Sequence, residues 1–474
     1  MIRLLTIIAA MMCSSLLAMG KTSDTRPNIV FCIADDWGWP HSPLYGDQVV
    51  KTPTLQRIAA NGVLFNHAFV SSPSCTPSRN AALTGQYHWR LTSGANLWSH
   101  FPKGVQTFPL ILTQHGYHVG SFRKAFGPGV DRSPSVSGKK YASVDAFFKA
   151  RPKDKPFCFW FGSSDPHRSY KVGSGIKSGM DPAKVQLPPY YPDHPSVRSD
   201  ICDYYFEVQR FDREVGELLD RLKQSGELDN TLVVMTGDHG WPFPRGKSNL
   251  YDIGARVPLA MQWGDKLGGK RRIDDFVSFV DFAPTFLELA GVDRPDDMSG
   301  RSLLPLLLSQ KSGQVEPSRS HVIYGKERHV PCQEKGTIAA PCRAIRNHKF
   351  LYIHNFFPDR WPVGAPEAEF RSNWADCDNG PSKSYILDHR VELQSIQAYE
   401  LCFAKRPQDE LYDVKNDPWQ IHNLAADPKH AETLKQLRTQ LMQELQTTGD
   451  LRVQGKGDIY ESFPYTGKNK RSKK

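Results

Sequence analysis

Four short apolar runs, each followed at once by polar residues, constrain the fold of this chain more than any other feature. They cover Asn28–Ala34, Tyr117–Phe122, Phe157–Phe161 and Thr231–Thr236. Short continuous runs of this kind are typical of strands buried on both faces, as in a parallel sheet with helices outside. Between the last two runs, apolar residues three and four apart predict a helix over Asp203–Gln224. The sequence therefore predicts an α/β fold.

Charged side chains follow all four runs within a few residues. They are Asp35 and Asp36, Arg123 and Lys124, Asp165 and His167, and Asp238 and His239. Because open α/β sheets bind ligands beyond the carboxyl ends of their strands, we expect these side chains to converge on one site. Each group also has an ordinary explanation. The paired aspartates can cap a helix, Asp238-His239-Gly240 can be a simple turn, and a lone histidine is more often a surface or core residue.

Three of these carboxylates and one imidazole form a candidate set of metal ligands. Asp35, Asp36, Asp238 and His239 offer mainly oxygen, which suits a hard divalent cation such as Ca²⁺ or Mg²⁺. The nitrogen and sulfur ligands of a structural zinc site are missing. The predicted site is therefore one for a hard cation.

A single cysteine follows closely in the sequence. Pro77 is suited to the first turn of a helix, so Cys75 would lie at the positive N-terminal end and Arg79 could face an anion there. A thiolate phosphatase is one candidate, but its loop needs five residues between cysteine and arginine, whereas this chain has three. A thiol nucleophile also suits a hard cation poorly, because such cations prefer oxygen ligands.

The segment Cys75-Thr-Pro-Ser-Arg79, with Leu83-Thr84-Gly85 after it, resembles the signature of the type I, formylglycine-dependent sulfatases of the alkaline phosphatase superfamily. The resemblance implies that a formylglycine-generating or anaerobic maturing enzyme oxidises Cys75 to 3-oxoalanine (formylglycine). One hydroxyl of the hydrated aldehyde would attack sulfur, and the second would then expel sulfate. A plain serine or cysteine would lack this second hydroxyl, so the enzyme would remain sulfated after the first step.

The resemblance extends over most of the chain. Arg26–Phe31, the Asp35–Gly38 turn, Lys51–Leu55 and the segment from Glu410 to Leu424 resemble family segments. His239 resembles the variant of iduronate-2-sulfatase, where Asp-Asn-Gly is the commoner late turn. Among subgroups the chain looks most like heparan N-sulfatase (sulfoglucosamine sulfohydrolase), through stretches at 165–168, 242–244 and 249–251.

The family's functional residues carry over onto matching positions. The resemblance implies one Ca²⁺ held by Asp35, Asp36, Asp238, His239 and the formylglycine at position 75. Arg79, Lys124 and Lys247 would neutralise the sulfate oxygens in the transition state. His167 would contact the leaving group and supply its proton.

One departure from the family pattern concerns a histidine. In the family it usually comes two or three residues after the lysine that corresponds to Lys124. Those positions are Phe126 and Gly127 here. We expect a general acid or a sulfate contact to be absent or to come from elsewhere, with His100 and His115 as candidates.

The resemblance also implies an alkaline-phosphatase-like architecture, with a large mixed, mostly parallel sheet sandwiched by helices and a smaller C-terminal α+β subdomain on an antiparallel sheet. We expect the catalytic domain at 21–342 and the subdomain at 343–466. The subdomain would open with a strand-like stretch, Arg343–Asn355, and include a helix over Pro428–Gln446. Arg371–Leu401 is polar and irregular, which suggests an insertion near the substrate entrance.

Both ends of the chain are distinctive. Residues 1–20 combine a basic start, a short apolar run and small residues, which predicts a signal peptide and export to the periplasm or the medium. Residues 467–474 form a basic tail with five of the chain's positive charges. Since this tail supplies half of the net charge of +10, we expect no nucleic-acid partner. No segment after residue 20 approaches transmembrane length, so we also expect no stable membrane insertion. Cys332 with Cys342, or Cys377 with Cys402, could pair after export.

Three functions fit these observations. The first is a sulfatase that hydrolyses sulfate esters or N-sulfate of a sulfated oligo- or polysaccharide. The second is a phosphoesterase on the same fold, although such relatives use serine, threonine or a second metal where this chain has Cys75. The third is a catalytically idle binder of sulfated glycans, suggested by the missing histidine and the basic tail.

Overall fold

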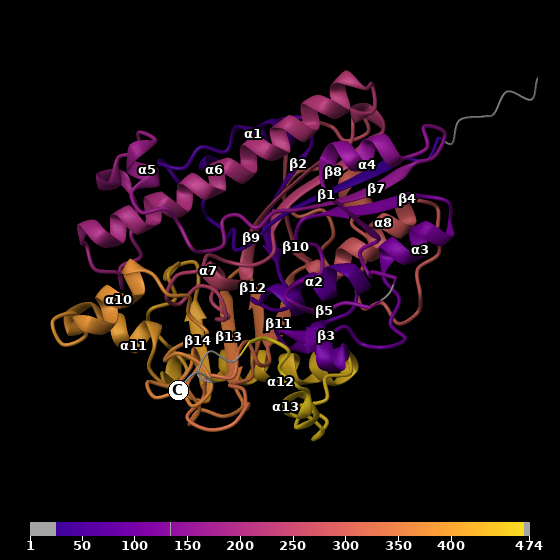
Figure 1. Cartoon of the computed structure of the whole chain (residues 1–474). Coiled ribbons are helices and arrows are strands. Elements are labelled where there is room, and N and C mark those ends of the chain that lie inside the picture. The colour runs from indigo at the N-terminus through magenta and orange to yellow at the C-terminus, as the bar shows by residue number, and fades with distance from the viewer. Residues whose placement is uncertain (1–24, 133, 469–474) are drawn as a thin grey trace, which may run out of the picture.

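The computed structural model describes residues 25–132 and 134–468, so the expected signal peptide and most of the basic tail lie outside the described part (Figure 1). Two separate sheets organise this part of the chain, one of eight strands and one of four. A two-stranded pair, β3 (Ser99–His100) and β5 (Gly129–Val130), lies apart from both. In the described residues, no helix is long and apolar enough to cross a membrane.

The large sheet confirms the expected mixed, mostly parallel arrangement. Its strand order is β10 (Arg271–Ser278), β2 (Val63–Phe69), β9 (Arg256–Gln262), β8 (Thr231–Gly237), β1 (Asn28–Ala34), β7 (Phe157–Gly162), β4 (His118–Phe122) and β6 (Lys139–Tyr141). Within these eight strands β9 alone runs antiparallel to its neighbours. The four apolar runs of the sequence are β8, β1, β7 and β4, which lie side by side, so their carboxyl ends share one edge.

Helices cover both faces of this sheet (Figure 1). On one side lie α1 (Pro53–Ala60), α4 (Val144–Ala150) and α6 (Pro195–Gln224), and on the other α2 (Cys75–Thr84), α3 (Phe108–Gln114) and α8 (Phe282–Leu289). Short helices complete this part: α5 (Ser174–Lys177), α7 (Asp252–Ala255) and α9 (Leu304–Leu308). Helix α6 begins before the predicted Asp203, because His194 caps its end and Pro195 suits the first helical position.

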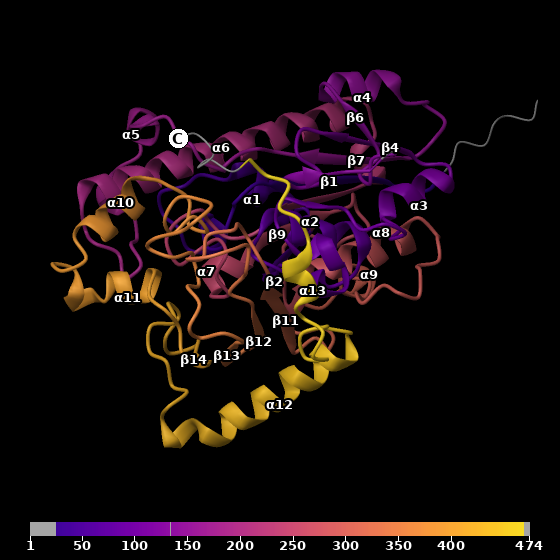
Figure 2. The same cartoon turned by 60° about the horizontal axis from the view of Figure 1, so that its bottom comes forward.

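The second sheet is antiparallel throughout, as expected. It pairs β11 (His321–Lys326), β12 (Cys342–Asn347), β13 (Phe350–Asn355) and β14 (Asp409–Asp413) in that order. Helix α12 (Ala431–Thr447) crosses its outer face (Figure 2) and buries the leucines that predicted it, Leu437, Leu441 and Leu445. The short α13 (Ile459–Ser462) follows.

Three details of the C-terminal region differ from expectation. Arg343–Asn355 forms the hairpin β12–β13 rather than one strand, because the Asn347 side chain accepts hydrogen bonds from the Lys349 and Phe350 amides and turns the chain. Strand β11 belongs to this sheet although it precedes the boundary expected at residue 342. The segment expected to be irregular holds α10 (Pro381–Asp388) and α11 (Ala398–Cys402).

All eight cysteines in the described residues are free, so neither suggested disulfide is formed.

Candidate active site

The charged residues predicted to converge meet at the carboxyl edge of the large sheet, with one exception. Arg123 turns away from this edge and forms a bidentate ion pair with Glu214 of α6. A cavity of about 530 Å³ opens at the edge, which is in the range of small-molecule sites at about 300–1,000 Å³. Its lining includes Asp35, Cys75, Lys124, His167 and Lys247. These residues follow β1, β2, β4, β7 and β8, so five strands contribute to one site.

The turn after β1, at residues 35–38, packs directly against the turn after β8, at residues 238–240. Asp36 has a left-handed backbone with φ of 75°, and its amide donates to Oδ1 of Asp238 at 2.9 Å. A Cβ atom on Gly38 would lie 2.9 Å from the Cα of Gly240, so this crossing leaves no room for a side chain. The close approach brings the side chains of both turns to one point.

A tight group of acceptor atoms marks that point. Ligand atoms of Asp35, Cys75, Asp238 and His239 all lie within 4.8 Å of one another, and these side chains are buried. The Nδ1 of His239 contacts the Gly240 carbonyl at 2.9 Å, so in the neutral ring Nδ1 carries the hydrogen and Nε2 presents a lone pair. That Nε2 faces Oδ1 of Asp36 at 3.1 Å and the Sγ of Cys75 at 3.3 Å.

These contacts fit a bound cation. Oδ1 of Asp36 is buried and has no hydrogen-bond partner among the described residues. An unpartnered carboxylate oxygen facing a nitrogen lone pair is costly in a protein interior unless a positive charge lies between them. The oxygen-rich donor set suits Ca²⁺. The residues present therefore fit the hard cation that the sequence predicted.

Three cationic side chains surround the acceptor group. Arg79 Nε donates to Asp238 at 2.8 Å, and Lys124 Nζ lies 2.5 and 2.6 Å from the two oxygens of Asp35. Lys247 Nζ lies 3.0 Å from Asp36 and 3.0 Å from Asp378. Burial by itself lowers the pKa of all three groups, but the carboxylates outweigh it, so each pKa is raised and each side chain stays charged.

Cys75 is the first residue of α2 and is only 2% exposed. Its Sγ lies 3.5 Å from Oδ1 of Asp35. Burial raises the pKa of this thiol well above its ordinary value, with Lys124 acting in the opposite direction and Asp35 adding to the rise. Because the thiolate is the reactive form of cysteine, the unmodified side chain is a poor nucleophile in this setting.

The loop after β7 places His167 on the wall of the cavity. Its Nδ1 contacts the Arg168 carbonyl at 2.5 Å. Arg168 forms a bidentate ion pair with Asp200 of α6 at 2.7 and 2.8 Å, and Asp200 also accepts from the amide and hydroxyl of Ser382 on α10. One buried carboxylate thus joins the His167 loop to the segment that the sequence suggested as an insertion.

Among the cavity-wall residues that sequence reasoning missed are Asp378 and His329. Asp378 comes from the insertion, so the polar character of that segment was a usable signal. His329 follows β11, and no sequence signal connects it with Cys75. The two histidines proposed to fill the gap at Phe126 and Gly127 do not line the cavity: His100 is exposed on β3, and His115 ends α3, where its ring contacts the Ile111 carbonyl.

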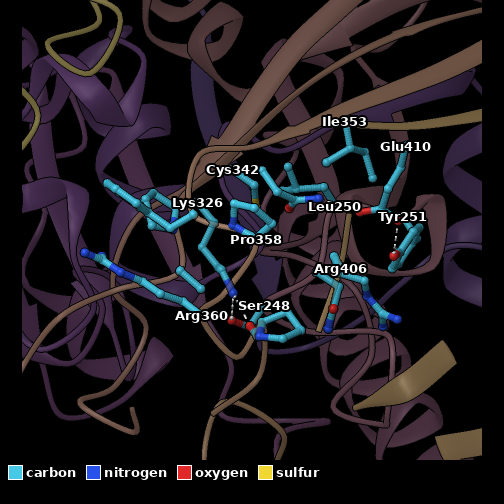
Figure 3. A pocket seen from close by; sticks show the side chains of 16 residues that line it. Ser248, Leu250, Tyr251, Lys326, Cys342, Ile353, Pro358, Arg360, Arg406 and Glu410 are labelled. Atoms are coloured by element: carbon cyan, nitrogen blue, oxygen red, sulfur yellow. Dashed lines mark hydrogen bonds between the residues drawn. The ribbon is translucent and has the colours of Figure 1, made fainter. Parts of the chain in front are cut away.

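A smaller cavity of about 30 Å³ lies behind the Lys247 turn, between this turn and the second sheet (Figure 3). Lys326 of β11 donates to the Ser248 hydroxyl at 3.3 Å, and the Tyr251 hydroxyl donates to Glu410 of β14 at 2.7 Å. The space is enough for about one water molecule. The second sheet therefore supports the turn that carries Lys247.

Comparison with known proteins identifies the family. The family model described as "Sulfatase" matches residues 27–292, more than half of the chain. The chain belongs to the sulfatase family. A second model, described as "N-sulphoglucosamine sulphohydrolase, C-terminal", matches residues 237–363 of this sulfatase. It is accordingly a sulfuric ester hydrolase of the type I family, as the Cys75 motif predicted.

The sulfatase has curated relatives over nearly its whole length. It is 29% identical to N-sulphoglucosamine sulphohydrolase from Homo sapiens over 490 residues, covering 90% of this chain and 92% of that protein. It is 28% identical to an ulvan-active sulfatase from Formosa agariphila over 479 residues, covering 90% and 76%.

Solved structures share the fold. An enzyme in complex with its substrate D-glucosamine-2-N,6-O-disulfate superposes with a TM-score of 0.67 at 21% identity, covering 90% of this chain and 98% of that one. A phosphonate monoester hydrolase from Silicibacter pomeroyi gives a TM-score of 0.66 at 16% identity, covering 90% and 96%. These similarities show a common architecture for sulfatases and phosphonate hydrolases.

Proposed function

We propose that this sulfatase removes sulfate from a sulfated carbohydrate, with N-sulfated glucosamine as the best supported class. It would use a formylglycine made from Cys75 and one Ca²⁺. The observation that carries the proposal is the position of Cys75 at the start of a helix, within 3.5 Å of both Asp35 and His239. Support for the sugar comes from the C-terminal family model, the human relative and the glucosamine disulfate named in the similar structure.

The charge of the site matches a sulfate monoester. Four carboxylates, those of Asp35, Asp36, Asp238 and Asp378, surround three cations, Arg79, Lys124 and Lys247. This set has a net charge of −1, and a divalent cation would change it to +1. A sulfate monoester carries one negative charge and would neutralise such a site, whereas a phosphate monoester dianion would leave an excess negative charge in a largely buried space.

In this proposal Asp35, Asp36, Asp238, His239 and the oxidised residue 75 hold the Ca²⁺, which would supply Lewis-acid stabilisation of sulfate oxygens. Arg79, Lys124 and Lys247 orient the sulfate group through charge-assisted hydrogen bonds. His167, on the opposite loop, contacts the leaving oxygen or nitrogen and supplies its proton.

Cys75 needs chemical conversion before it can serve this role. Its thiol is buried and its pKa is raised, so it would be mostly protonated at neutral pH. Oxidation by a formylglycine-generating or anaerobic maturing enzyme would replace sulfur with oxygen, the donor that a hard cation prefers. That maturing enzyme is therefore a proposed partner of this chain.

The remaining expectations from the sequence stay proposals. We propose export through a signal peptide at residues 1–20, a catalytic domain that includes the large sheet, and a C-terminal subdomain built on the small one. If sheet membership defines the boundary, the subdomain begins near β11 rather than at residue 343.

The test combines mass spectrometry with sulfate release. The full chain is expressed with a maturing enzyme, and the peptide containing residue 75 is analysed for the aldehyde. Release of free sulfate is then measured on N-sulfated and O-sulfated glucosamine, glycosaminoglycan and algal oligosaccharides. We expect the aldehyde, release from a glucosamine substrate and no release by the Cys75→Ala variant. An unmodified thiol in protein from the native host would favour an idle glycan binder, and phosphate release in place of sulfate release would favour a phosphoesterase.

A further inference from the structure

A buried histidine from the second sheet lies beside the helix that carries Cys75. His329 follows β11, is 4% exposed and lines the same cavity as Cys75 and Lys247. Its Nδ1 lies 2.8 Å from the hydroxyl of Ser74, the residue immediately before Cys75. The imidazole therefore belongs to the site although it is distant from Cys75 in sequence.

The backbone around His329 is fixed on both sides. The Arg328 amide donates to the Asn96 side chain at 3.1 Å, and the Arg328 carbonyl accepts from the Leu97 amide at 3.0 Å. The Val330 amide donates to Asp376 at 3.0 Å. These three hydrogen bonds hold the backbone, and the contact of Nδ1 with Ser74 holds the ring, so the imidazole has a defined position before any ligand binds, which is the condition for preorganised binding.

Only one nitrogen of the ring is engaged by the protein. Nδ1 contacts Ser74, whose hydroxyl caps no helix amide, and Nε2 has no hydrogen-bond partner among the described residues. When the Ser74 hydroxyl donates to Nδ1, Nε2 carries a hydrogen and becomes a donor. A buried ring with one committed and one free nitrogen can therefore bind a ligand in the cavity.

The loop after β4 has no space for such a ring. A Cβ atom on Gly127 would lie 2.6 Å from the Cα and 2.7 Å from the amide nitrogen of Thr76, which follows Cys75 directly. Phe126 packs against Phe101 with ring centroids 5.9 Å apart. Backbone atoms therefore fill the space between the loop after β4 and the start of α2. The imidazole beside Cys75 comes instead from His329, which follows β11.

The other donors near Cys75 are already paired with carboxylates. Arg79 binds Asp238, Lys124 binds Asp35, and Lys247 binds Asp36 and Asp378. His329 Nε2 differs from them because it is uncommitted. A ligand with several acceptor oxygens beside Cys75 would find this donor without breaking an ion pair.

We propose that His329 is a sulfate-binding residue of this enzyme, with Nε2–H donating a hydrogen bond to a sulfate oxygen, and that Ser74 is its positioning residue. The inference rests on the proposed function, since it takes the sulfate group to lie beside residue 75. It assigns His329 to the sulfate side of the reaction and leaves the leaving-group side to His167.

The first experiment measures binding of inorganic sulfate by calorimetry in full-length Cys75→Ala protein, which needs no maturation. His329→Asn keeps a polar group near the position of Nδ1, for Ser74, and loses the donor at Nε2. His329→Gln places an amide donor near Nε2. We expect the Asn variant to bind sulfate about 10-fold or more weakly and the Gln variant to keep most of the affinity. Equal affinity in the Asn variant and its parent would overturn the proposal.

The second experiment compares substrates with good and poor leaving groups in the matured enzyme. We expect His329→Asn to lower kcat/KM by a similar factor for a nitrophenyl sulfate and for a sulfated sugar, because the sulfate group is common to both. A loss confined to the sugar would place His329 on the leaving-group side and contradict the proposal. Ser74→Ala should give a smaller loss, and thermal unfolding should stay within a few degrees of the parent.

The experiments distinguish a failure of the proposed function from a failure of the role assigned to His329. If matured wild-type enzyme releases no sulfate from any sulfated substrate and the Cys75→Ala parent binds no sulfate, the proposed function itself is wrong. If release and binding are present but His329→Asn matches its parent in both, only the assignment of His329 is wrong.

Discussion

The carboxylate of Asp378 lies 3.0 Å from the ammonium group of Lys247, joining the segment before α10 to the turn after β8. Lys247 is buried, and its second carboxylate partner is Asp36. Asp378 is one of the four carboxylates that face three cations in the site, so it contributes one of the charges that set the net charge of −1. The charge of Asp378 should therefore influence which anion the site accepts.

Asp378→Asn should bind the phosphate monoester of a sugar more tightly than the wild type does, relative to the sulfate monoester of the same sugar. Removing one negative charge makes the site more positive, and one charge at ~8 Å contributes roughly 2 kcal/mol at an effective dielectric constant of 20, or up to roughly 30-fold in affinity. Dissociation constants of the two monoesters, measured by calorimetry in the Cys75→Ala background with and without the Asp378 change, give the measurement. Asp220→Asn, an exposed change on α6, is the matched control. An unchanged phosphate-to-sulfate ratio would argue against charge matching.

Cys75→Ser should trap a sulfated form of the enzyme. A serine hydroxyl can attack sulfur, but it lacks the second hydroxyl that would expel sulfate, so turnover stops after one event. Intact mass spectrometry after incubation with substrate should detect one added sulfate group per chain. Cys75→Ala should show none. Steady sulfate release by the serine variant would contradict the need for an aldehyde.

Removal of calcium should destabilise the protein reversibly. Oδ1 of Asp36 faces the Nε2 lone pair of His239 without a hydrogen between them, so the folded state gains from a cation there. Calcium at 100 times its Kd should add about 2.7 kcal/mol to the free energy of unfolding. Thermal unfolding with a chelator and with added calcium measures this difference. Asp36→Asn should respond much less, and an equal response would place the calcium elsewhere.

Gly127→Ala should impair activity more than stability. Its new Cβ would meet the Thr76 backbone at 2.6 Å, so the start of α2 and residue 75 must shift. Overpacking of this kind costs about 1–3 kcal/mol. Gly268→Ala is the control, because its nearest neighbour is the flexible end of the Gln310 side chain at 2.9 Å. Sulfate release and urea unfolding should be measured together, and full activity in Gly127→Ala would show that the site tolerates the shift.

Asp200→Ala should destabilise the fold strongly. It removes the partner of Arg168, whose side chain is 8% exposed, and the acceptor of two hydrogen bonds from Ser382. Breaking a buried pair from one side costs about 3–5 kcal/mol. Asp220→Ala, which breaks an exposed pair with Arg57, should cost about 0–1 kcal/mol. Chemical denaturation measures both, and similar costs for the two variants would refute the structural role of Asp200.

The sequence by itself determined four adjacent strands of the large sheet and the centre of the site. Continuous apolar runs must be buried on both faces, and their adjacent parallel pairing brings Asp35, Lys124, His167 and Asp238 to one edge. The motif from Cys75 to Arg79 identified the family, because its chemistry depends on residues close together in the chain. These features are local, so they are readable without the fold.

Tertiary structure decided which distant residues complete the site. His329 and Asp378 reach the cavity only because the small antiparallel sheet and the segment before α10 pack against the large sheet. His100 and His115 are closer to Cys75 in sequence, yet β3 and the end of α3 hold them away from it. Packing between elements far apart in the chain sets these positions, and it depends on side-chain contacts that leave no periodic signal in the sequence.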